Sequence, residues 1–585
     1  MDHMHGPHTW PHARTRRTRW STTVPTADPS PHFPDPHLPE RQWHAPVPDT
    51  GDTGDPHSRV VIAGGGLAGL EVARQLAALG VEDVLVIEAG PAQDLLHIHS
   101  AHKPDQALRT FLDPAGDPHF HRPWIPESAP HYAANAGLRK RLGGRSLYWY
   151  GASLPVENWA LADWPESIVK DLRGSWRGGG PLYEQVAADL GVDPNRLDRQ
   201  QPVLELGGFR LVRTPQAETR FGDDGRWYAY SPLDHWRDPV TGAALDGPRG
   251  IRFLCGTEVL SVDIKDGRAR GVLVRETGPN AEPRRISADS VVLAAGTIES
   301  SRLAIQALCA VDPGRPPRLD GLTDHIVQGF FLRVRDAGDA GDGGDSGDGG
   351  GGDAGGGSAS HGLSGIASGS YVAACEDVVR SNLFITVERP EPGVLLFDVR
   401  LTGEQLPGTG SRVTCEPGGA YPWRTTVTAN LAPADRDVVG RQHRVLEEVW
   451  RRLAAEFGLT ATPLAFDDFD HPVRTNAFVL PESIGAEASE GPFTWSSLLG
   501  TEDHEGCTLP LGEVLDDRHA FAAVPGLYAC GPATFPRMGA ANPSLTTLAL
   551  ARRLAHFLAE TEAAAETAAE TDDRKPHRGT SEAQA

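Results

Sequence analysis

The chain has 585 residues, of which 39% are hydrophobic and 23% charged, and its formal net charge is -23 at pH 7. This length exceeds what one compact core usually holds, so we expect at least two domains. The excess of acidic residues argues against a nucleic-acid partner, because phosphate binding needs a basic surface. No apolar run is long enough to span a bilayer, so we expect no membrane partner.

The cysteines and the N-terminal sequence favour a cytoplasmic protein. The six cysteines are scattered without a CxxC pair, which indicates neither a metal site nor a disulfide framework. A reducing cytoplasm fits this usage. The arginine-rich residues 14–19 are followed by Ser, Thr and Pro rather than by an apolar segment, so we expect no secretion signal.

Three segments have compositions typical of disordered chain. Residues 1–57 are rich in His, Pro, Asp and Arg and show no periodicity. Residues 336–360 are a Gly/Asp insertion, which lacks the apolar residue that calcium-binding Asp/Gly repeats need for packing. Residues 561–585 alternate Ala, Glu and Thr, and we expect a tail there that at most extends a preceding helix.

The first folded segment predicts a βαβ unit. Val60–Ala63 is an apolar strand-like run, Leu70–Leu79 has apolar residues at helical spacing, and Val84–Glu88 is a second strand-like run. Farther on, residues 251–274 predict strands joined at Asp266-Gly267, and 288–296 predict another buried strand.

The turn between the first strand and the helix has the pattern GxGxxG. Its first glycine permits a tight turn, its second lets a pyrophosphate approach the backbone, and its third lets the helix pack on the strand. The helix N-terminus offers unpaired N–H groups to the phosphates, and the acid that ends the second strand can accept both ribose hydroxyls. An acid there argues against a 2′-phosphate, whereas FAD and NAD both stay open on this motif. The expected cofactor contacts of the unit are Gly64, Gly66, Leu67, Ala68, Gly69, Glu88 and Ala89.

Four further motifs follow along the chain. They are Gly143-Gly144-Arg145-Ser146, then Ala295-Gly296 with Ser300 and Leu303, then His504 with Thr508 and Gly512, and last Phe535-Pro536 with Asn542-Pro543-Ser544-Leu545-Thr546. In this order they resemble the glucose–methanol–choline (GMC) family of FAD-dependent oxidoreductases, over roughly residues 58–560. Each motif alone is weak, but four in sequence are a strong signal.

The resemblance implies an α/β fold with two domains. A Rossmann-like, doubly wound FAD-binding domain would be built from residues 58–150, 251–310 and 505–560. An α+β substrate domain, from residues 151–250 and 311–504, would cover the flavin with an antiparallel sheet. The further cofactor contacts that the resemblance implies are Gly143, Gly144, Ser146, Val259, Ala295, Gly296, Gly531, Pro543 and Thr546.

The chain departs from the family pattern at three places. Gly531 stands where an Asp is usual, which puts one contact toward the flavin ribityl phosphate in doubt. Cys507 stands where a Gly is usual. Some members attach the flavin through a His near the Gly-Gly-x-Ser segment, but here the nearby residues are Tyr148, Trp149 and Tyr150, so we expect non-covalent FAD.

Alcohol oxidation needs a base for the hydroxyl proton while the carbinol hydrogen leaves as a hydride toward flavin N5. Imidazole suits the first task, because its ordinary pKa lies near neutrality. By the resemblance, His504 is the candidate base and Asn542 its partner, which hydrogen-bonds the substrate oxygen; Asn542 also suits an N-cap before Pro543. Among the other histidines, we expect His325 to be structural or near the flavin edge.

Two further interpretations concern the surroundings of this pair. The aromatic stretches 146–151 and 226–236 fit a substrate pocket or core packing equally well. Glu502 and Asp503 beside His504 fit solvated loop acids better than groups that tune its pKa.

The sequence therefore predicts an FAD-dependent alcohol oxidase or dehydrogenase acting on a small-molecule alcohol. Its electron acceptor would be dioxygen or another compound, and no metal is expected. The alternatives are a flavin-dependent tailoring dehydrogenase or isomerase of secondary metabolism, or a flavin-binding protein that has lost activity.

Overall fold

The computed structural model describes residues 56–573, with gaps inside this range. The gaps are 103–105, 108–109, 112–115, 128–130, 133–135, 194–202, 207, 223–224, 279, 336–362, 364–365, 377, 407, 409 and 467–490. The predicted Gly/Asp insertion and nearly all of the predicted N-terminal tail therefore lie outside the described residues. The described residues all belong to one compact unit.

A seven-stranded sheet contains the predicted βαβ unit. Its order is β10 (Ile251–Cys255), β2 (Val84–Glu88), β1 (His57–Ala63), β13 (Arg284–Leu293), β12 (Arg268–Glu276) and β11 (Thr257–Lys265), and β22 (Leu527–Ala529) also pairs with β13. Strands β10, β2, β1, β13 and β22 are parallel, and β12 and β11 continue the sheet as antiparallel strands. Asp266 and Gly267, both at positive φ, form the predicted hairpin turn between β11 and β12.

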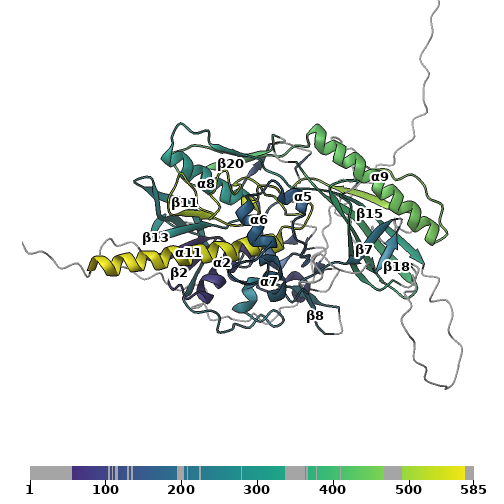
Figure 1. Cartoon of the computed structure of the whole chain (residues 1–585), viewed down its shortest axis with the longest axis horizontal. Coiled ribbons are helices and arrows are strands. Elements are labelled where there is room, and N and C mark those ends of the chain that lie inside the picture. The colour runs from purple at the N-terminus through teal and green to yellow at the C-terminus, as the bar shows by residue number, and fades with distance from the viewer. Residues whose placement is uncertain are drawn as a thin grey trace, which may run out of the picture. The chain divides into compact units, whose positions relative to one another are not determined.

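Helices cover this sheet, which explains why its parallel strands are apolar along nearly their whole length. Helix α2 (Leu67–Ala78) follows β1 and packs beside the long C-terminal helix α11 (Ser544–Asp573), as Figure 1 shows. Helix α8 (Thr297–Val311) follows β13 and packs on β11. Val60, Leu70 and Leu554 are completely buried in the shared core. Helix α11 continues through Asp573, so the tail that we expected from residue 561 is helical in its first part.

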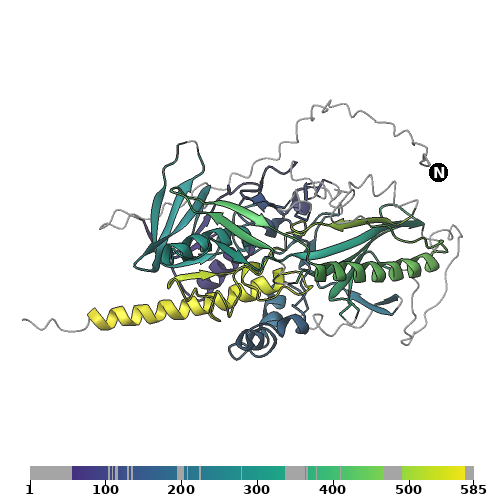
Figure 2. The same ribbon diagram turned by 90° about the horizontal axis from the view of Figure 1, so that it is seen from above.

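A second seven-stranded sheet is antiparallel throughout. Its order is β21 (Phe493–Ser497), β15 (His325–Arg335), β18 (Val394–Glu404), β17 (Ser381–Glu388), β16 (Gly369–Ala374), β7 (Phe209–Arg213) and β6 (Leu204–Leu206). Helix α9 (Pro433–Glu456) packs on β15 and β18, and Figure 2 shows it running along the sheet. Successive side chains of a strand point to opposite faces. Phe330 accordingly contacts Trp450 of α9, while Phe331 contacts Trp495 of β21.

Shorter elements connect the two sheets. Strands β14 (Arg318–Asp320), β19 (Arg412–Glu416), β20 (Arg424–Thr428) and β4 (Ile125–Pro126) form a four-stranded sheet, and β3 (Phe120–His121) pairs with β5 (Leu138–Arg139) and β8 (Glu218–Arg220) with β9 (Trp227–Ala229). The short helices are α3 (Ile98–Ala101), η2 (Gly144–Leu147), α5 (Asn158–Leu161), α6 (Glu166–Arg173), α7 (Leu182–Asp189), η4 (Pro232–His235) and η7 (Pro532–Thr534).

This architecture confirms the predicted fold class, a doubly wound α/β part built from discontinuous segments together with an antiparallel sheet. The exact domain boundaries stay a prediction. All six cysteines are free thiols. No helix of the described residues combines the length and the apolarity needed to cross a membrane.

Candidate active site

A cavity of about 1040 Å³ extends from the turn after β1 to the antiparallel sheet. Gly64, Gly66 and Glu88 line one end, and Phe331 and Arg400 line the other. A space of this size and reach can hold a dinucleotide together with a small substrate.

The three glycines of the βαβ turn have three separate roles. Gly64 has φ +111°, and a Cβ there would lie 2.4 Å from the carbonyl oxygen of Ala294. A Cβ on Gly69 would lie 2.0 Å from the carbonyl oxygen of Gly64, so this glycine lets α2 pack against the turn. A Cβ on Gly66 would meet no atom within 4 Å, although Gly66 lines the cavity at the N-terminus of α2. The open space at Gly66 and the positive end of the helix fit a pyrophosphate.

The carboxylate of Glu88 is held by two backbone amides. The amide of Gly65 donates to Oε2 at 2.9 Å, and the amide of Gly90 donates to Oε1 at 2.7 Å. Burial raises the pKa of Glu88 to about 7, and these hydrogen bonds oppose the shift. Each carboxylate oxygen has a second lone pair for a ribose hydroxyl, as the sequence pattern requires.

Most of the predicted site residues meet at this cavity. Those that line it are His504, Asn542, Gly64, Gly66, Leu67, Ala68, Glu88, Ala89, Gly144, Ser146, Val259, Ala295, Gly296, Gly531 and Pro543. Gly69, Gly143 and Thr546 are not among the lining residues. Gly69 packs the helix, and the Thr546 hydroxyl is 2.9 Å from the hydroxyl of Tyr183.

The backbone conformation bears on two of the three departures from the family pattern, those at Gly531 and Cys507. Gly531 has φ +115°, a backbone conformation that an Asp side chain would strain, and it lies beside Ala68 at the start of α2. Cys507 has φ +66°, so this chain keeps a left-handed turn where the family has a glycine.

The loop around His504 is tied to two of the recognised motifs. In α8, the Ser301 hydroxyl donates to the Thr508 hydroxyl at 2.8 Å, and the Thr297 hydroxyl donates to the Glu505 carbonyl. Arg145 of η2 contacts Oε2 of Glu505 at 2.7 Å and Oδ1 of Asp503 at 3.0 Å. Our expectation that Asp503 is a solvated loop acid was therefore wrong, because a partly buried ion pair with Arg145 holds it.

His504 lines the cavity and its ring contacts a second histidine. The Nδ1 atoms of His504 and His325 are 2.8 Å apart, and the rings meet edge to face. Burial, followed by the nearby His325 and Arg145, lowers the pKa of His504 well below its ordinary value. The imidazole is thus neutral at physiological pH and able to accept a proton.

Asn542 lies next to α11 with an unsatisfied side chain. Its Oδ1 atom is buried and has no hydrogen-bond partner among the described residues. Helix α11 begins at Ser544, so Asn542 does not take the N-cap role that we considered for it. A buried amide oxygen without a hydrogen-bond partner lowers the stability of the fold, so we expect a bound ligand to supply the missing hydrogen bond.

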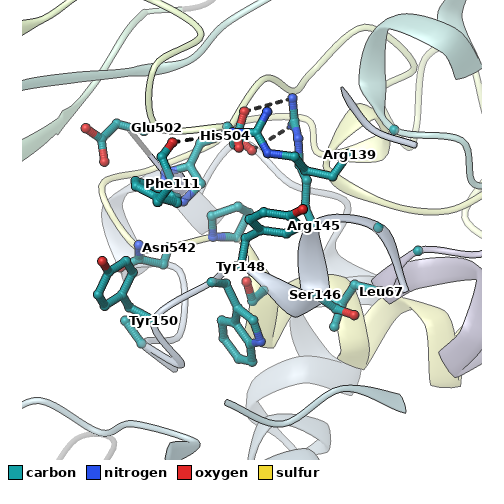
Figure 3. A pocket seen from close by; sticks show the side chains of 18 of the residues that line it. Leu67, Phe111, Arg139, Arg145, Ser146, Tyr148, Tyr150, Glu502, His504 and Asn542 are labelled. Carbon is teal, nitrogen blue, oxygen red and sulfur yellow. Dashed lines mark hydrogen bonds and ion pairs between the residues drawn. The ribbon is translucent and has the colours of Figure 1, made fainter. Parts of the chain in front are cut away.

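Aromatic side chains form one wall of the cavity. Figure 3 shows Tyr148 and Tyr150 around the same space as His504 and Asn542. Trp149 and Trp227 also line it, so both aromatic stretches of the sequence reach the cavity. Tyr148 also packs beneath Arg141, whose guanidinium lies 4.8 Å from its ring centre.

Sequence reasoning missed two groups. Arg145 stands inside the Gly-Gly-x-Ser motif, and its central position there was the available signal. Arg400 and Asp398 of β18 form an ion pair on the cavity wall, and Glu502 lines the same wall and accepts from Ser497 at 3.0 Å. These charged residues follow no motif that the sequence could reveal. No group of His, Cys, Asp and Glu in the described ranges could hold a metal ion.

The fold and site define a dinucleotide-binding protein with a histidine-containing cavity. Residues 421–551 match the family model described as GMC oxidoreductase. The C-terminal part of the chain is thus similar to the GMC oxidoreductase family, in agreement with the predicted family, and this similarity supports FAD as the cofactor.

The fold is shared with solved structures along most of the chain. A pyridoxine 4-oxidase from Mesorbium loti is 16% identical with a TM-score of 0.51, over 85% of this chain and 98% of that one. A formate oxidase from Aspergillus oryzae RIB40, a variant studied for modification of its FAD, is 14% identical with a TM-score of 0.52, over 87% of this chain and 99% of that one.

A curated relative matches a shorter part. A D-amino acid dehydrogenase from Rhizobium johnstonii is 26% identical over 293 residues, which are 41% of this chain and 61% of the relative. The chain thus covers less than two thirds of that relative. Together the comparisons support an oxidoreductase.

Proposed function

We propose that this oxidoreductase acts on CH–OH groups, with His504 as the base that takes the hydroxyl proton and Asn542 as the partner that orients the substrate oxygen. The observation that carries the proposal is the pair itself: a neutral imidazole and a buried, unpartnered amide oxygen line one cavity. Bound FAD supplies the acceptor for the hydride.

The residues of the chain prepare the cavity for this reaction. Gly66, Glu88 and the N-terminus of α2 would hold the pyrophosphate and the ribose at one end, as their geometry fits both groups. The N-terminus of α11, next to Pro543, would favour negative charge at the flavin pyrimidine. We expect the FAD to be bound without a covalent link, since Tyr148, Trp149 and Tyr150 occupy the wall near the Gly-Gly-x-Ser segment.

At the other end of the cavity, His504 and Asn542 would each act on the alcohol in a different way. A substrate hydroxyl placed between His504 and Asn542 would give its proton to the imidazole. The Asn542 Oδ1 atom can accept, and its amide nitrogen can donate, so the side chain suits an oxygen that changes from hydroxyl to carbonyl. Tyr150 and Trp227 would exclude water from the apolar part of the substrate.

The test begins with the cofactor and continues with a substrate panel. The purified protein should be yellow and should release FAD into the supernatant after acid precipitation. A panel of hydroxymethyl aromatic compounds, aliphatic alcohols, formate and D-amino acids, added without oxygen, should bleach the flavin only with alcohols. Bleaching by formate or D-amino acids alone would contradict the alcohol assignment. Oxygen consumption in air would then separate an oxidase from a dehydrogenase with another acceptor.

A further inference from the structure

His325 lies directly behind the proposed base. It is the first residue of β15, it is completely buried, and its ring makes two hydrogen bonds. Its Nδ1 lies 2.8 Å from Nδ1 of His504, and its Nε2 lies 3.1 Å from the carbonyl oxygen of Gly539. A chain of three groups therefore runs from a backbone carbonyl to the ring that faces the cavity.

The chemistry of these groups fixes where the protons lie. A carbonyl oxygen only accepts hydrogen bonds, so Nε2 of His325 must carry a proton. A neutral imidazole has one N–H, which leaves Nδ1 of His325 as an acceptor. Nδ1 of His504 must then donate to it, and Nε2 of His504 is left with a free lone pair. Burial supports the neutral form by lowering the pKa of His325 to about 4.

We propose that His325 is a positioning residue that holds His504 in the tautomer whose Nε2 is the base. This inference rests on the proposed function of His504. When His504 takes a proton at Nε2, its Nδ1 keeps donating to His325, so the hydrogen bond persists through the transfer and no side chain has to turn. Without His325, the two neutral tautomers of His504 would both be populated, and one of them has no base toward the cavity.

The structure also holds His325 itself in place. Its backbone amide donates a hydrogen bond to Oδ1 of Asp324 at 2.7 Å. Gly539, whose carbonyl contacts the His325 ring, is itself held by a hydrogen bond from its amide to Oε1 of Glu404 at 3.1 Å. Charged groups around the histidine pair are Arg145, Asp324, Glu404, Asp503 and Glu505. Arg145 forms ion pairs with Asp503 and Glu505, and among the described residues the side chain that contacts the His504 ring by a hydrogen bond is that of His325.

The direct test is nitrogen NMR of the FAD-loaded protein with 15N-labelled histidine. The His504 signals are assigned by their loss in His504→Gln. We expect Nδ1 of His504 to be protonated and Nε2 unprotonated, and His325 to show the opposite arrangement. In His325→Phe the His504 signals should become those of mixed tautomers, and kcat should fall about tenfold to a hundredfold, a part of what a general base contributes, with little change in KM.

Two variants separate positioning from folding. His325→Gln keeps one donor and one acceptor, and it should recover a large part of the lost kcat. His519→Phe alters another completely buried histidine that does not line the cavity, and it should leave both the His504 signals and kcat unchanged. A protonated Nε2 on His504 in the unaltered protein, or an unchanged tautomer in His325→Phe, would overturn the inference. The NMR measurement reports the tautomer of His504 whether or not an alcohol is oxidised. A failure of the proposed function would instead appear in the substrate panel, so the two failures can be distinguished.

Discussion

The backbone amide of Gly65 lies 2.9 Å from Oε2 of Glu88, which joins the glycine-rich turn after β1 to the acid at the end of β2. A second amide, that of Gly90, holds the other oxygen. The turn and the acid are 23 residues apart in the sequence, yet they form one preorganised unit. This unit sets the orientation in which the ribose and the pyrophosphate would bind.

Glu88→Gln tests this unit. The amide group would place an N–H against one of the two backbone N–H donors and would lose a charged acceptor for the ribose. We expect FAD affinity to fall at least about tenfold, which corresponds to about 1.4 kcal/mol, in the range of a hydrogen bond to a charged group. Titration of the apoprotein with FAD, followed by flavin fluorescence, measures it. Glu166→Gln changes an exposed acid of α6 and should leave the affinity as it is.

Gly66→Ala and Gly69→Ala form a matched pair. A methyl group at Gly66 meets no protein atom, so the apoprotein should keep its stability within about 0.5 kcal/mol while FAD binding is lost or greatly weakened. A methyl group at Gly69 would overlap the carbonyl of Gly64, so this variant should unfold at a clearly lower temperature. Thermal unfolding and FAD titration of both variants give the answer. If the two variants showed the same unfolding temperature and the same FAD affinity, this result would argue against a phosphate at Gly66.

Arg145→Leu should destabilise the fold. Arg145 is the ion-pair partner of both Asp503 and Glu505, and the Glu505 side chain is 2% exposed. Removing the cation leaves buried carboxylates without their partner, which typically costs about 3–5 kcal/mol. Denaturant unfolding measures the loss. Arg210→Leu removes an exposed arginine of β7 and serves as the control. If both changes lowered the free energy of unfolding by a similarly small amount, Arg145 would not be needed to stabilise the buried carboxylates.

Asn542→Ala should separate catalysis from stability. The Asn542 Oδ1 atom has no partner in the described structure, so its removal should leave the melting temperature unchanged or slightly higher. The same change should lower kcat/KM about tenfold to a hundredfold, because the substrate oxygen loses a hydrogen bond in the transition state. A lower melting temperature with unchanged kcat/KM would instead assign Asn542 a structural role.

Buried histidines predict a loss of stability in acid. Burial lowers the pKa of His519 to about 3, so below pH about 6.5 the unfolded chain binds a proton that the folded chain does not. The free energy of unfolding should therefore fall as the pH decreases from 6.5 toward 3, by about 1.4 kcal/mol per pH unit for this group. His519→Phe should show a shallower decline in denaturant titrations. Parallel pH profiles would contradict a neutral, buried His519. Glu88, whose pKa is raised, makes the free energy of unfolding rise as the pH decreases. This contribution is the same in the unaltered protein and in His519→Phe, so it does not affect the comparison.

The sequence predicted the local parts of this structure well. The βαβ unit, the hairpin at Asp266 and the strand before Ala295 all depend on short-range patterns, and each is present. The glycines of the turn could be assigned because each answers a steric requirement within a few residues.

The long-range contacts were beyond such patterns. His325 and His504 lie 179 positions apart in the sequence, and the pairing of β15 with β18 and β21 places His325 beside His504. The same holds for Arg145, which reaches Glu505 across 360 positions. The sequence around Asn542 fits a helix N-cap, but in the structure this residue lines the cavity instead. Its Oδ1 atom, unpartnered among the described residues, is free there to bind a substrate oxygen.

The central claim is that His504 removes a proton from an alcohol at a bound flavin. Its most direct test is the visible spectrum of the FAD-loaded protein during anaerobic addition of an alcohol from the panel, in the unaltered protein and in His504→Ala. We expect the flavin band to bleach in the unaltered protein and to persist in His504→Ala at equal FAD content. Bleaching at the same rate in both proteins would show that another group takes the proton and would contradict the account.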